Sequence, residues 1–398
     1  MAFSIPARSV CEGHLVKIAI IGGGIGGLTA GLALRRAGFE PVVYERAERF
    51  GEVGAGISLS PNAVKGLEAL GFGDFLASTS NEPLDQFLFH WETGEELLRY
   101  DRRTTREAYG AAYYQLHRAD LLAGLVEAFG SRHCVMGAEL AALEQDQEGV
   151  RLAFADGSEA RADIVIAADG LRSAVRGGLF DAIEPVFSGH VAWRALIPAE
   201  KLPPRASEPA SINHIGPGQN LVTYPVRGRH LVNMVALTRS ADWADESWNA
   251  RAAPRELADL FEGWADYVAE VIAAIPDGAL YRWGLFVREP LGSWVKGRIA
   301  LLGDAAHPML PYMGQGASST IEDAVVLGRC FEAVSNPIEA LRLYEAARIE
   351  RAGFLQAESN VGGERLQALD PYALRDNPPR NEDALGIFSY DPARVPVV

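Results

Sequence analysis

Two glycine-rich turns are the places in this 398-residue sequence where backbone N–H groups could hold a ligand. One is "GDAAHPMLPYMGQG" at 303–316, which follows the apolar run "GRIALL" and precedes the helix-like run "ASSTIEDAVVLGRC". The other is "GGGIGG", far upstream at 22–27. Glycine lets the backbone approach a bound group closely, and a helix N-terminus offers unpaired N–H groups and a positive dipole end. The two turns are therefore candidates for opposite ends of one ligand.

The upstream turn has the features of a dinucleotide-binding fingerprint. Gly22, Gly24 and Gly27 fit the spacing G-x-G-x-x-G after the apolar strand-like run "VKIAII", and a helix-like run follows up to Gly38. The first two glycines permit a tight turn close to a pyrophosphate, the third lets helix and strand pack closely, and the helix N-terminus faces the phosphates. The alternative is a glycine-rich turn that serves packing alone.

An acidic residue ends the next predicted strand, "PVVYE", at Glu45. Its carboxylate could accept both hydroxyls of an adenosine ribose and would repel the 2′-phosphate of NADP. The first turn therefore fits FAD or NAD, and it is not an NADPH site.

Composition narrows the class of protein. The formal net charge is −15 and 48% of the residues are hydrophobic, so a substantial core is possible and nucleic acid is a poor partner. The three cysteines are widely spaced without a Cys-x-x-Cys pair, so we expect neither a disulfide framework nor a metal site. We also expect no signal peptide and no membrane span, which makes the cytoplasm the default location.

The rest of the chain does not continue as a simple NAD dehydrogenase would. Gly51, Gly54 and Gly56 predict a flexible loop, and a helix with Ser60 as N-cap follows. Residues 150–176 read as a hairpin with an Asp-Gly turn and then an apolar strand that ends at Asp169-Gly170.

Three motifs in this order resemble those of the class A flavoprotein monooxygenases, the single-component aromatic hydroxylases. They are the glycine fingerprint at 22–27, Asp169-Gly170 and Gly303-Asp304, within a resemblance that spans about residues 15–360. "HRADL" resembles the family segment whose arginine, here Arg118, contacts FAD.

The resemblance implies that FAD lies along both turns. Asp304 would bind the ribityl chain, Pro308 and Pro311 would fix the loop beside the flavin ring, and the helix from about Ala317 would stabilise the negative charge of reduced flavin through its dipole. His307 is expected to be structural, and a glycine-rich helix cap is the alternative reading of this stretch. The expected FAD contacts are Gly22, Gly24, Ile25, Gly26, Gly27, Glu45, Arg46, Gly56, Arg118, Asp169, Gly170, Asp304, Pro311, Gly314, Gln315, Gly316 and Ala317.

The fold that we expect is α/β, with a Rossmann-like FAD-binding domain of the p-hydroxybenzoate hydroxylase type and an inserted antiparallel β-sheet substrate domain. Short runs rich in Val, Trp, Tyr and Thr at 185–284 suggest that sheet, and 84–104 supplies a further hairpin that turns at Thr93-Gly94. The predicted divisions are FAD-binding parts at 1–83, 105–184 and 285–365, substrate parts at 84–104 and 185–284, and a tail at 366–398.

In this family NAD(P)H reduces FAD, and the reduced flavin reacts with O2 to a 4a-hydroperoxide that hydroxylates an electron-rich ring. The protein must then supply a phenol-activating group, a dry pocket and an anchor for a small aromatic substrate. The catalytic candidates are Tyr224 in "TYPVRG" and Asn220; the substrate-binding candidates are Arg194, which could hold a carboxylate bidentately, Tyr224, Met234, Tyr312 and Met313. For each, a purely structural role is the alternative.

The sequences of these motifs are similar to those of salicylate hydroxylase and its relatives, including 3-hydroxybenzoate and 6-hydroxynicotinate hydroxylases. Several of these carry a histidine where this chain has Asn220. A neutral amide is a poorer base and a weaker carboxylate partner, which favours a modified or less acidic phenol over salicylate itself. Decarboxylation, the choice of NADH or NADPH, and a homodimer stay open, as does whether the tail wraps its own surface or a partner subunit. The alternative functions are an oxidase or epoxidase of the same fold and a non-catalytic flavin-binding protein.

Overall fold

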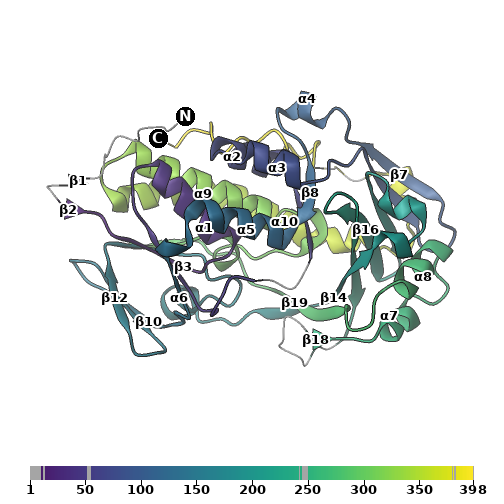
Figure 1. Cartoon of the computed structure of the whole chain (residues 1–398), viewed down its shortest axis with the longest axis horizontal. Helices are drawn as coiled ribbons and strands as arrows, with labels where there is room; N and C mark the ends of the chain where they lie inside the picture. Colours follow the sequence, from purple (N-terminus) through teal and green to yellow (C-terminus); the bar gives the residue numbers. More distant parts are fainter. Residues whose placement is uncertain are drawn as a thin grey trace.

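The structure is a computed structural model, which describes residues 10–11, 14–51, 55–241, 243, 250–378, 380 and 382–397. Gly54, expected in a flexible loop, lies outside the described residues. Two large sheets dominate the described chain, a mostly parallel one covered by long helices and an antiparallel one flanked by short helices (Figure 1).

The parallel sheet has six strands in the order β20-β21-β13-β3-β4-β9. Its central strands are short and fully apolar, as expected for strands buried on both faces. All neighbours run parallel except the edge pair β20–β21. The strands are β3 (Ile18–Ile21), β4 (Val42–Glu45), β9 (Cys134–Met136), β13 (Ile164–Ala167), β20 (Val295–Lys296) and β21 (Ile299–Leu301).

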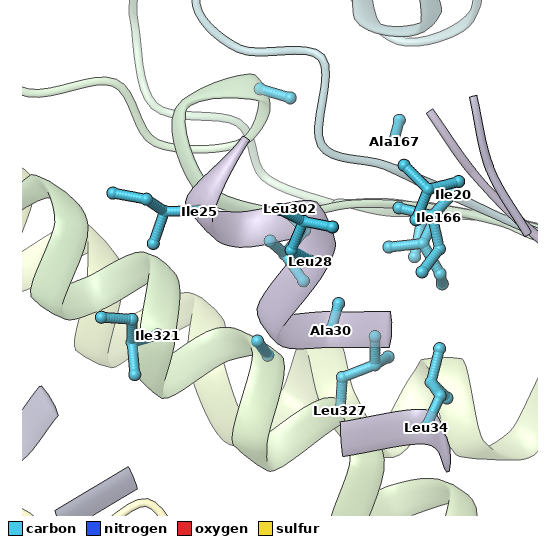
Figure 2. Packing of buried hydrophobic residues seen from close by; sticks show 14 of the residues in the cluster. Ile20, Ile25, Leu28, Ala30, Leu34, Ile166, Ala167, Leu302, Ile321 and Leu327 are labelled. Atoms are coloured by element: carbon cyan, nitrogen blue, oxygen red, sulfur yellow. The ribbon is translucent and has the colours of Figure 1, made fainter. Parts of the chain in front are cut away.

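Long helices pack beside this sheet, with α1 (Ile25–Arg36) against α9 (Gly316–Ala333) and α5 (Arg118–Phe129), and α10 (Pro337–Leu366) against α9 (Figure 1). Apolar side chains of α1 and α9, among them Leu28, Leu34 and Leu327, fill the space between the helices (Figure 2). The approach is close, because a Cβ on Gly328 would lie 2.7 Å from the Cβ of Ala33. The two glycine turns at the starts of α1 and α9 are therefore held by one packed core.

The antiparallel sheet has eight strands in the order β18-β19-β14-β17-β16-β15-β6-β7. The hairpin β6–β7 belongs to it through parallel pairing of β6 with β15. The strands are β6 (Asp85–His90), β7 (Glu96–Asp101), β14 (Val186–Pro198), β15 (Ala210–Gly216), β16 (Gln219–Val226), β17 (Leu231–Arg239), β18 (Ala250–Arg251) and β19 (Tyr281–Val287). One face of this sheet packs on α7 (Pro254–Leu260) and α8 (Asp266–Ala273).

Smaller elements complete the described chain. A three-stranded sheet contains the hairpin with its Asp156-Gly157 turn, and β5 pairs antiparallel with β8. The remaining strands are β1 (Val10–Cys11), β2 (His14–Leu15), β5 (Gly56–Leu59), β8 (Tyr114–His117), β10 (Leu140–Gln145), β11 (Val150–Phe154) and β12 (Glu159–Ala162). The remaining helices are α2 (Pro61–Ala69), α3 (Gly73–Thr79), α4 (Thr105–Tyr109), α6 (Ala174–Leu179) and α11 (Tyr372–Asp376), with short 3-10 turns at Ser131–His133, Ala199–Lys201, Pro204–Ser207, Gly303–Ala305 and Pro311–Met313.

Most predicted elements occur where they were expected. Gly56, expected in a flexible loop, instead begins strand β5, where it pairs with His117. A second difference lies at α2. Ser60 is its N-cap residue, but its hydroxyl caps no backbone N–H and instead lies 2.6 Å from Oδ1 of Asn62. Among the described helices, none combines the length and the apolar character that a membrane crossing requires.

Candidate active site

A cavity of about 1080 Å³ lies between the two large sheets. Both glycine turns line it, and so does one face of the antiparallel sheet. We call the part lined by the turns the cofactor half and the part lined by the sheet the substrate half.

The first turn is shaped for a bound group. Gly22 has φ +105°, and a Cβ there would lie 2.4 Å from the carbonyl oxygen of Ala168. A Cβ on Gly27 would lie 1.9 Å from the carbonyl oxygen of Gly22, so the third glycine closes the turn. At Gly24, in contrast, a Cβ would meet no described atom within 4 Å, and Gly24, Ile25 and Gly26 line the cavity. The turn is tightly packed on the side of Ala168 and open on the side of the cavity. This fits a pyrophosphate at the N-terminus of α1.

Glu45 lies at the end of β4, beside this turn. Its carboxylate accepts hydrogen bonds from the backbone N–H of Gly23 at 2.6 Å and of Ala47 at 2.9 Å. Glu45 and Arg46 line the cavity, so the carboxylate is fixed where an adenosine ribose would lie.

Asp169 and Asp304 line the next stretch of the cavity, together with Gly170 and Arg118. Burial raises the pKa of Asp169, although hydrogen bonds from Ser173 and nearby backbone oppose the shift. Burial also raises the pKa of Asp304, against the opposing charges of His307 and Arg118. The Asp304 carboxylate is surrounded by protein yet open to the cavity, so it is placed to accept hydrogen bonds from a polar ligand.

The second turn opens onto the cavity at the N-terminus of α9. Gly314 has φ +62°, and a Cβ there would meet no described atom within 4 Å. Pro311, Gly314, Gly316 and Ala317 line the cavity. Gln315 does not line it; its side-chain amide nitrogen donates to Ser60 at 3.0 Å, away from the cavity.

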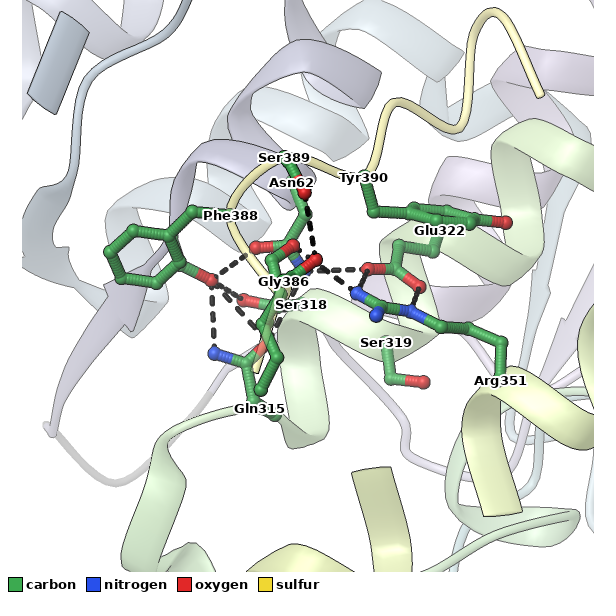
Figure 3. A network of polar contacts seen from close by, with 12 residues as sticks. Asn62, Gln315, Ser318, Ser319, Glu322, Arg351, Gly386, Phe388, Ser389 and Tyr390 are labelled. Atoms are coloured by element: carbon green, nitrogen blue, oxygen red, sulfur yellow. Dashed lines mark hydrogen bonds and ion pairs between the residues drawn. The ribbon is translucent and has the colours of Figure 1, made fainter. Parts of the chain in front are cut away.

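Behind this turn lies a buried polar network that holds it in place. Nδ2 of Asn62 donates to Oε1 of Gln315 at 3.2 Å and to Oε1 of Glu322 at 2.6 Å, and Arg351 pairs with Glu322 at 3.1 Å (Figure 3). Arg348, fully buried, pairs with Glu322 at 2.7 Å and with Asp323 at 2.8 Å.

His307 belongs to the same network, as predicted for a structural histidine. Its Nε2 lies 2.6 Å from Oδ2 of Asp323, which also accepts the backbone N–H of Gly303 at 3.1 Å. Burial alone would raise the pKa of Asp323, but His307 and Arg348 outweigh it and hold that pKa below its usual value. This ionised carboxylate ties the start of the second turn to α9.

In the substrate half, Arg194, Asn220, Tyr224, Tyr312 and Met313 all line the cavity. Met234 does not. It lies on the opposite face of β17, fully buried among the residues that pack on α7 and α8, while its neighbours Val235 and Leu237 face the cavity. The expectation that Met234 contacts substrate is wrong, because side chains alternate along a strand.

Tyr224 is a buried hydroxyl in this wall. Burial, and then the neighbouring Tyr113, raise its pKa well above the usual value, although Arg194 and a hydrogen bond with Ser58 oppose the shift. Its phenol is therefore neutral near pH 7. It can exchange hydrogen bonds with a substrate but is no base.

Asn220 is held in a chain of amides. It donates to Oδ1 of Asn213 at 3.2 Å and accepts from Nε2 of Gln367 at 3.4 Å. It is neutral and hydrogen-bonded, so it can orient a substrate group and cannot take a proton from one.

Arg194 and Tyr312 both line the wall. The Arg194 guanidinium lies 4.8 Å from the ring centroid of Trp283. Tyr312 packs against two glycines of α10. A Cβ on Gly362 would lie 2.6 Å from the Cβ of Tyr312, and a Cβ on Gly363 would lie 2.7 Å from the Cε2 of Tyr312. Burial raises the pKa of Tyr312 as well.

Several cavity residues were missed by the sequence reasoning. Tyr113 precedes β8, and polar side chains of β6, β15 and the C-terminal segment face the same space. The alternation of polar Ser211 and Asn213 with apolar neighbours in "ASINHIG" is a signal that could have found part of this set. Among the missed residues are Gln86, Tyr113, Gln115, Ser211, Asn213, Trp283 and Glu382.

Comparison with known proteins decides the family. The family model for the FAD binding domain matches residues 15–358. The chain belongs to this family. With the relatives below, it is a class A flavoprotein aromatic monooxygenase, and the predicted family, cofactor and enzyme class are confirmed.

Among its relatives is 3-amino-4-hydroxybenzoate 2-monooxygenase PtnB3 of Streptomyces platensis, 38% identical over 390 residues, which cover 96% of this chain and 98% of that protein. Salicylate hydroxylase of Pseudomonas putida is 34% identical over 384 residues, which cover 89% and 87% of the two chains. The crystal structure of Klebsiella pneumoniae HpxO with FAD and uric acid superposes with TM-score 0.83 at 30% identity, covering 94% of this chain and 96% of that one. The likeness along almost the whole chain confirms the expected fold class, a parallel Rossmann-like sheet joined to an antiparallel one.

The geometry agrees with this cofactor. FAD fits the open space beside Gly24 and Gly314. It also fits the fixed carboxylate of Glu45 and the Asp304 carboxylate at the cavity wall. The role of each predicted contact residue remains a prediction. FAD supplies the transfer of electrons from NAD(P)H to oxygen; the chain itself binds, orients and shields the reactants.

Proposed function

We propose that this enzyme uses NAD(P)H and O2 to hydroxylate a small aromatic carboxylate whose ring carries a hydroxyl or amino group. The observation that carries the proposal is the substrate wall, which combines the Arg194 guanidinium with neutral hydroxyls and amides. Tyr224 and Asn220 are neutral, and no histidine lines the cavity among the described residues.

Each part of the wall has a role in this proposal. Arg194 binds the carboxylate, since a guanidinium matches its two oxygens. Tyr224 exchanges a hydrogen bond with the ring substituent, and Asn220, Tyr312 and Met313 fix the plane of the ring. A wall in which Tyr224 and Asn220 take no proton is best matched by a ring that its own amino or hydroxyl group already makes electron-rich. A hydroxybenzoate with an amino group, as named for the Streptomyces platensis relative, has this chemistry.

The test is oxidation of NADH and of NADPH by the FAD-loaded enzyme, with product mass recorded. The panel contains 3-amino-4-hydroxybenzoate, 3-hydroxybenzoate, salicylate, 6-hydroxynicotinate and uric acid. Oxidation that an aromatic carboxylate stimulates, with a product one oxygen atom heavier, supports the proposal. A product that has also lost its carboxyl group assigns the decarboxylating type. Formation of hydrogen peroxide alone with every carboxylate contradicts the proposal and favours an oxidase.

The role of Tyr224 is tested by Tyr224→Phe, which removes only the hydroxyl. We expect product formation to slow about tenfold or more, as for the loss of one hydrogen bond to a buried polar group, while reduction of FAD by NAD(P)H changes little. Equal turnover and equal product yield per NAD(P)H would remove Tyr224 from the mechanism.

A further inference from the structure

The C-terminal segment 382–390 packs against the substrate half of the cavity. Glu382 lines the cavity itself. Ile387 and Phe388 are fully buried, in a cluster that includes Tyr113 and Met313. This part of the tail therefore packs on its own chain.

Arg102, just after β7, connects this segment to the cavity wall. Its side chain is only 2% exposed. Its Nε donates to Oε1 of Gln86 at 2.8 Å, while its two terminal nitrogens lie 3.3 Å from Asp383 and 3.5 Å from Glu382. Gln86 lies on β6 and lines the cavity. The flat guanidinium fork holds the amide and both carboxylates at once, which a lysine could not do in the same geometry.

Aromatic rings surround the same guanidinium. Its carbon lies 5.0 Å from the ring centroid of Phe388 and 5.6 Å from those of Tyr100 and Tyr113. Tyr100 and Tyr113 both line the cavity. The Tyr113 hydroxyl is in hydrogen-bonding contact with Ser58 and Gln86, and Ser58 also contacts the Tyr224 hydroxyl. Contacts thus run without a break from the tail carboxylates to the predicted substrate hydroxyl partner.

A separate set of contacts holds the far end of the segment. Nζ of Lys65 donates to the carbonyl oxygen of Phe388 at 2.9 Å and to that of Tyr390 at 3.3 Å. Arg351 donates to the carbonyl oxygen of Ile387. The same guanidinium pairs with Glu322 (Figure 3). Loss of the Arg102 contacts should therefore loosen the cavity end of the segment and leave its far end attached.

We infer that Arg102 is a positioning residue for the substrate, and that residues 382–383 form part of the substrate site through it. Arg102 clamps the two tail carboxylates to β6 and so fixes Gln86 and Tyr113 at the positions from which they contact the ring. The inference rests on the proposed function for the identity of the substrate, but the clamp itself does not.

The test compares Arg102→Leu with Arg394→Leu in the FAD-loaded full-length enzyme. Arg394 is a matched control, because it pairs with a tail carboxylate, Asp391, but is 87% exposed and does not line the cavity. We expect Arg102→Leu to keep its FAD, and to bind substrate roughly tenfold to a hundredfold more weakly in a titration of the flavin absorbance, as for a lost charged hydrogen-bond set. Product per NAD(P)H should fall as well. Wild-type affinity and product yield in an FAD-loaded Arg102→Leu would overturn the inference.

A milder variant covers the case in which Arg102→Leu does not fold. Glu382→Gln with Asp383→Asn removes both tail charges from partly exposed positions and leaves the Arg102–Gln86 hydrogen bond in place. We expect it to weaken substrate binding severalfold and to speed amide hydrogen exchange at 84–90 and 113–117. Unchanged binding and unchanged exchange in this variant would refute the clamp. If no aromatic carboxylate stimulates the wild-type enzyme, the proposed function fails, and the exchange measurement alone then decides whether the clamp exists.

Discussion

One buried histidine, His214 on β15, should make a distinct contribution to the pH dependence of this enzyme's stability. Its ring is 2% exposed and stacks between Phe89, at 5.3 Å, and Tyr267, at 5.2 Å. Burial, helped by the nearby charge of Arg205, lowers the pKa of His214 from 6.5 to about 3. In the folded state the ring is therefore neutral over a range of pH in which the unfolded chain binds a proton.

The sign and size of the change in the free energy of unfolding with pH follow from proton linkage. Below about pH 6.5 the unfolded state binds a proton that the folded state does not bind. The free energy of unfolding therefore falls as the pH falls. For a single histidine with these two pKa values, the loss between about pH 7.5 and pH 5.5 is about 1.4 kcal/mol, and it grows to about 2.7 kcal/mol by pH 4.5. The loss levels off only near the folded-state pKa of about 3.

The assay is urea unfolding of the wild type, His214→Phe and His230→Phe at about pH 7.5 and pH 5.5. Phenylalanine keeps the aromatic stack at 214 but has no proton to bind, so this variant should lose about 1.4 kcal/mol less than the wild type over that interval. His230 is an exposed histidine and a matched control, and its variant should follow the wild type. Equal pH dependence in the wild type and His214→Phe would refute the reasoning.

Three further predictions concern the turns that hold the cofactor. Asp304→Ala should lose FAD, because the carboxylate that faces the cavity is gone; a fully loaded, yellow variant after gel filtration would contradict this. Asp323→Asn should lower the free energy of unfolding by about 3 kcal/mol in urea, since Arg348 and His307 lose a buried charged partner; a change below about 1 kcal/mol would be inconsistent with an ionised buried network. Gly27→Ala should yield folded protein without FAD, because the new Cβ would lie 1.9 Å from a backbone oxygen in the turn; normal flavin absorbance would show that the turn can relax.

The parts of the fold that the sequence predicts well are those with local causes. The first turn could be predicted because its strand, glycines, helix and Glu45 lie within one continuous stretch. The role of each follows from local backbone geometry. The helix after the second turn begins at Gly316, one residue before the expected Ala317, for the same reason. The hairpin at 150–162 likewise depends on a local Asp-Gly turn.

Met234 shows where such reasoning fails. On β16 and β17, Met234 pairs with Thr223, and Tyr224 pairs with Asn233. Residues directly opposite each other in a ladder share a face, so Met234 lies with Thr223 on the side away from Tyr224. The face of each residue depends on the register between two strands, which no single strand reveals.

The clamp at Arg102 could not be predicted for a different reason. Its partners Glu382 and Asp383 lie at the far end of the sequence, in a stretch without apolar periodicity. Only the folded chain brings them to β6. Gln315 is a similar case, since its side chain turns away from the cavity to partners on α2 that the sequence places far from it.

The buried ion pairs behind the second turn differ in kind from the groups on the substrate wall. Behind the second turn, ionised groups are fully buried and paired, with Arg348 between Glu322 and Asp323. Such a network is costly to break, so it fixes the turn whose open N-terminus would face a cofactor that becomes negatively charged on reduction. The substrate wall instead presents the neutral Tyr224 and Asn220, which add no fixed negative charge near a carboxylate. Buried ion pairs thus hold the second turn rigid, and in the substrate half the neutral Tyr224 and Asn220 line the same space as the charged Arg194 and Glu382, which leaves the guanidinium of Arg194 as the group that can pair with a carboxylate.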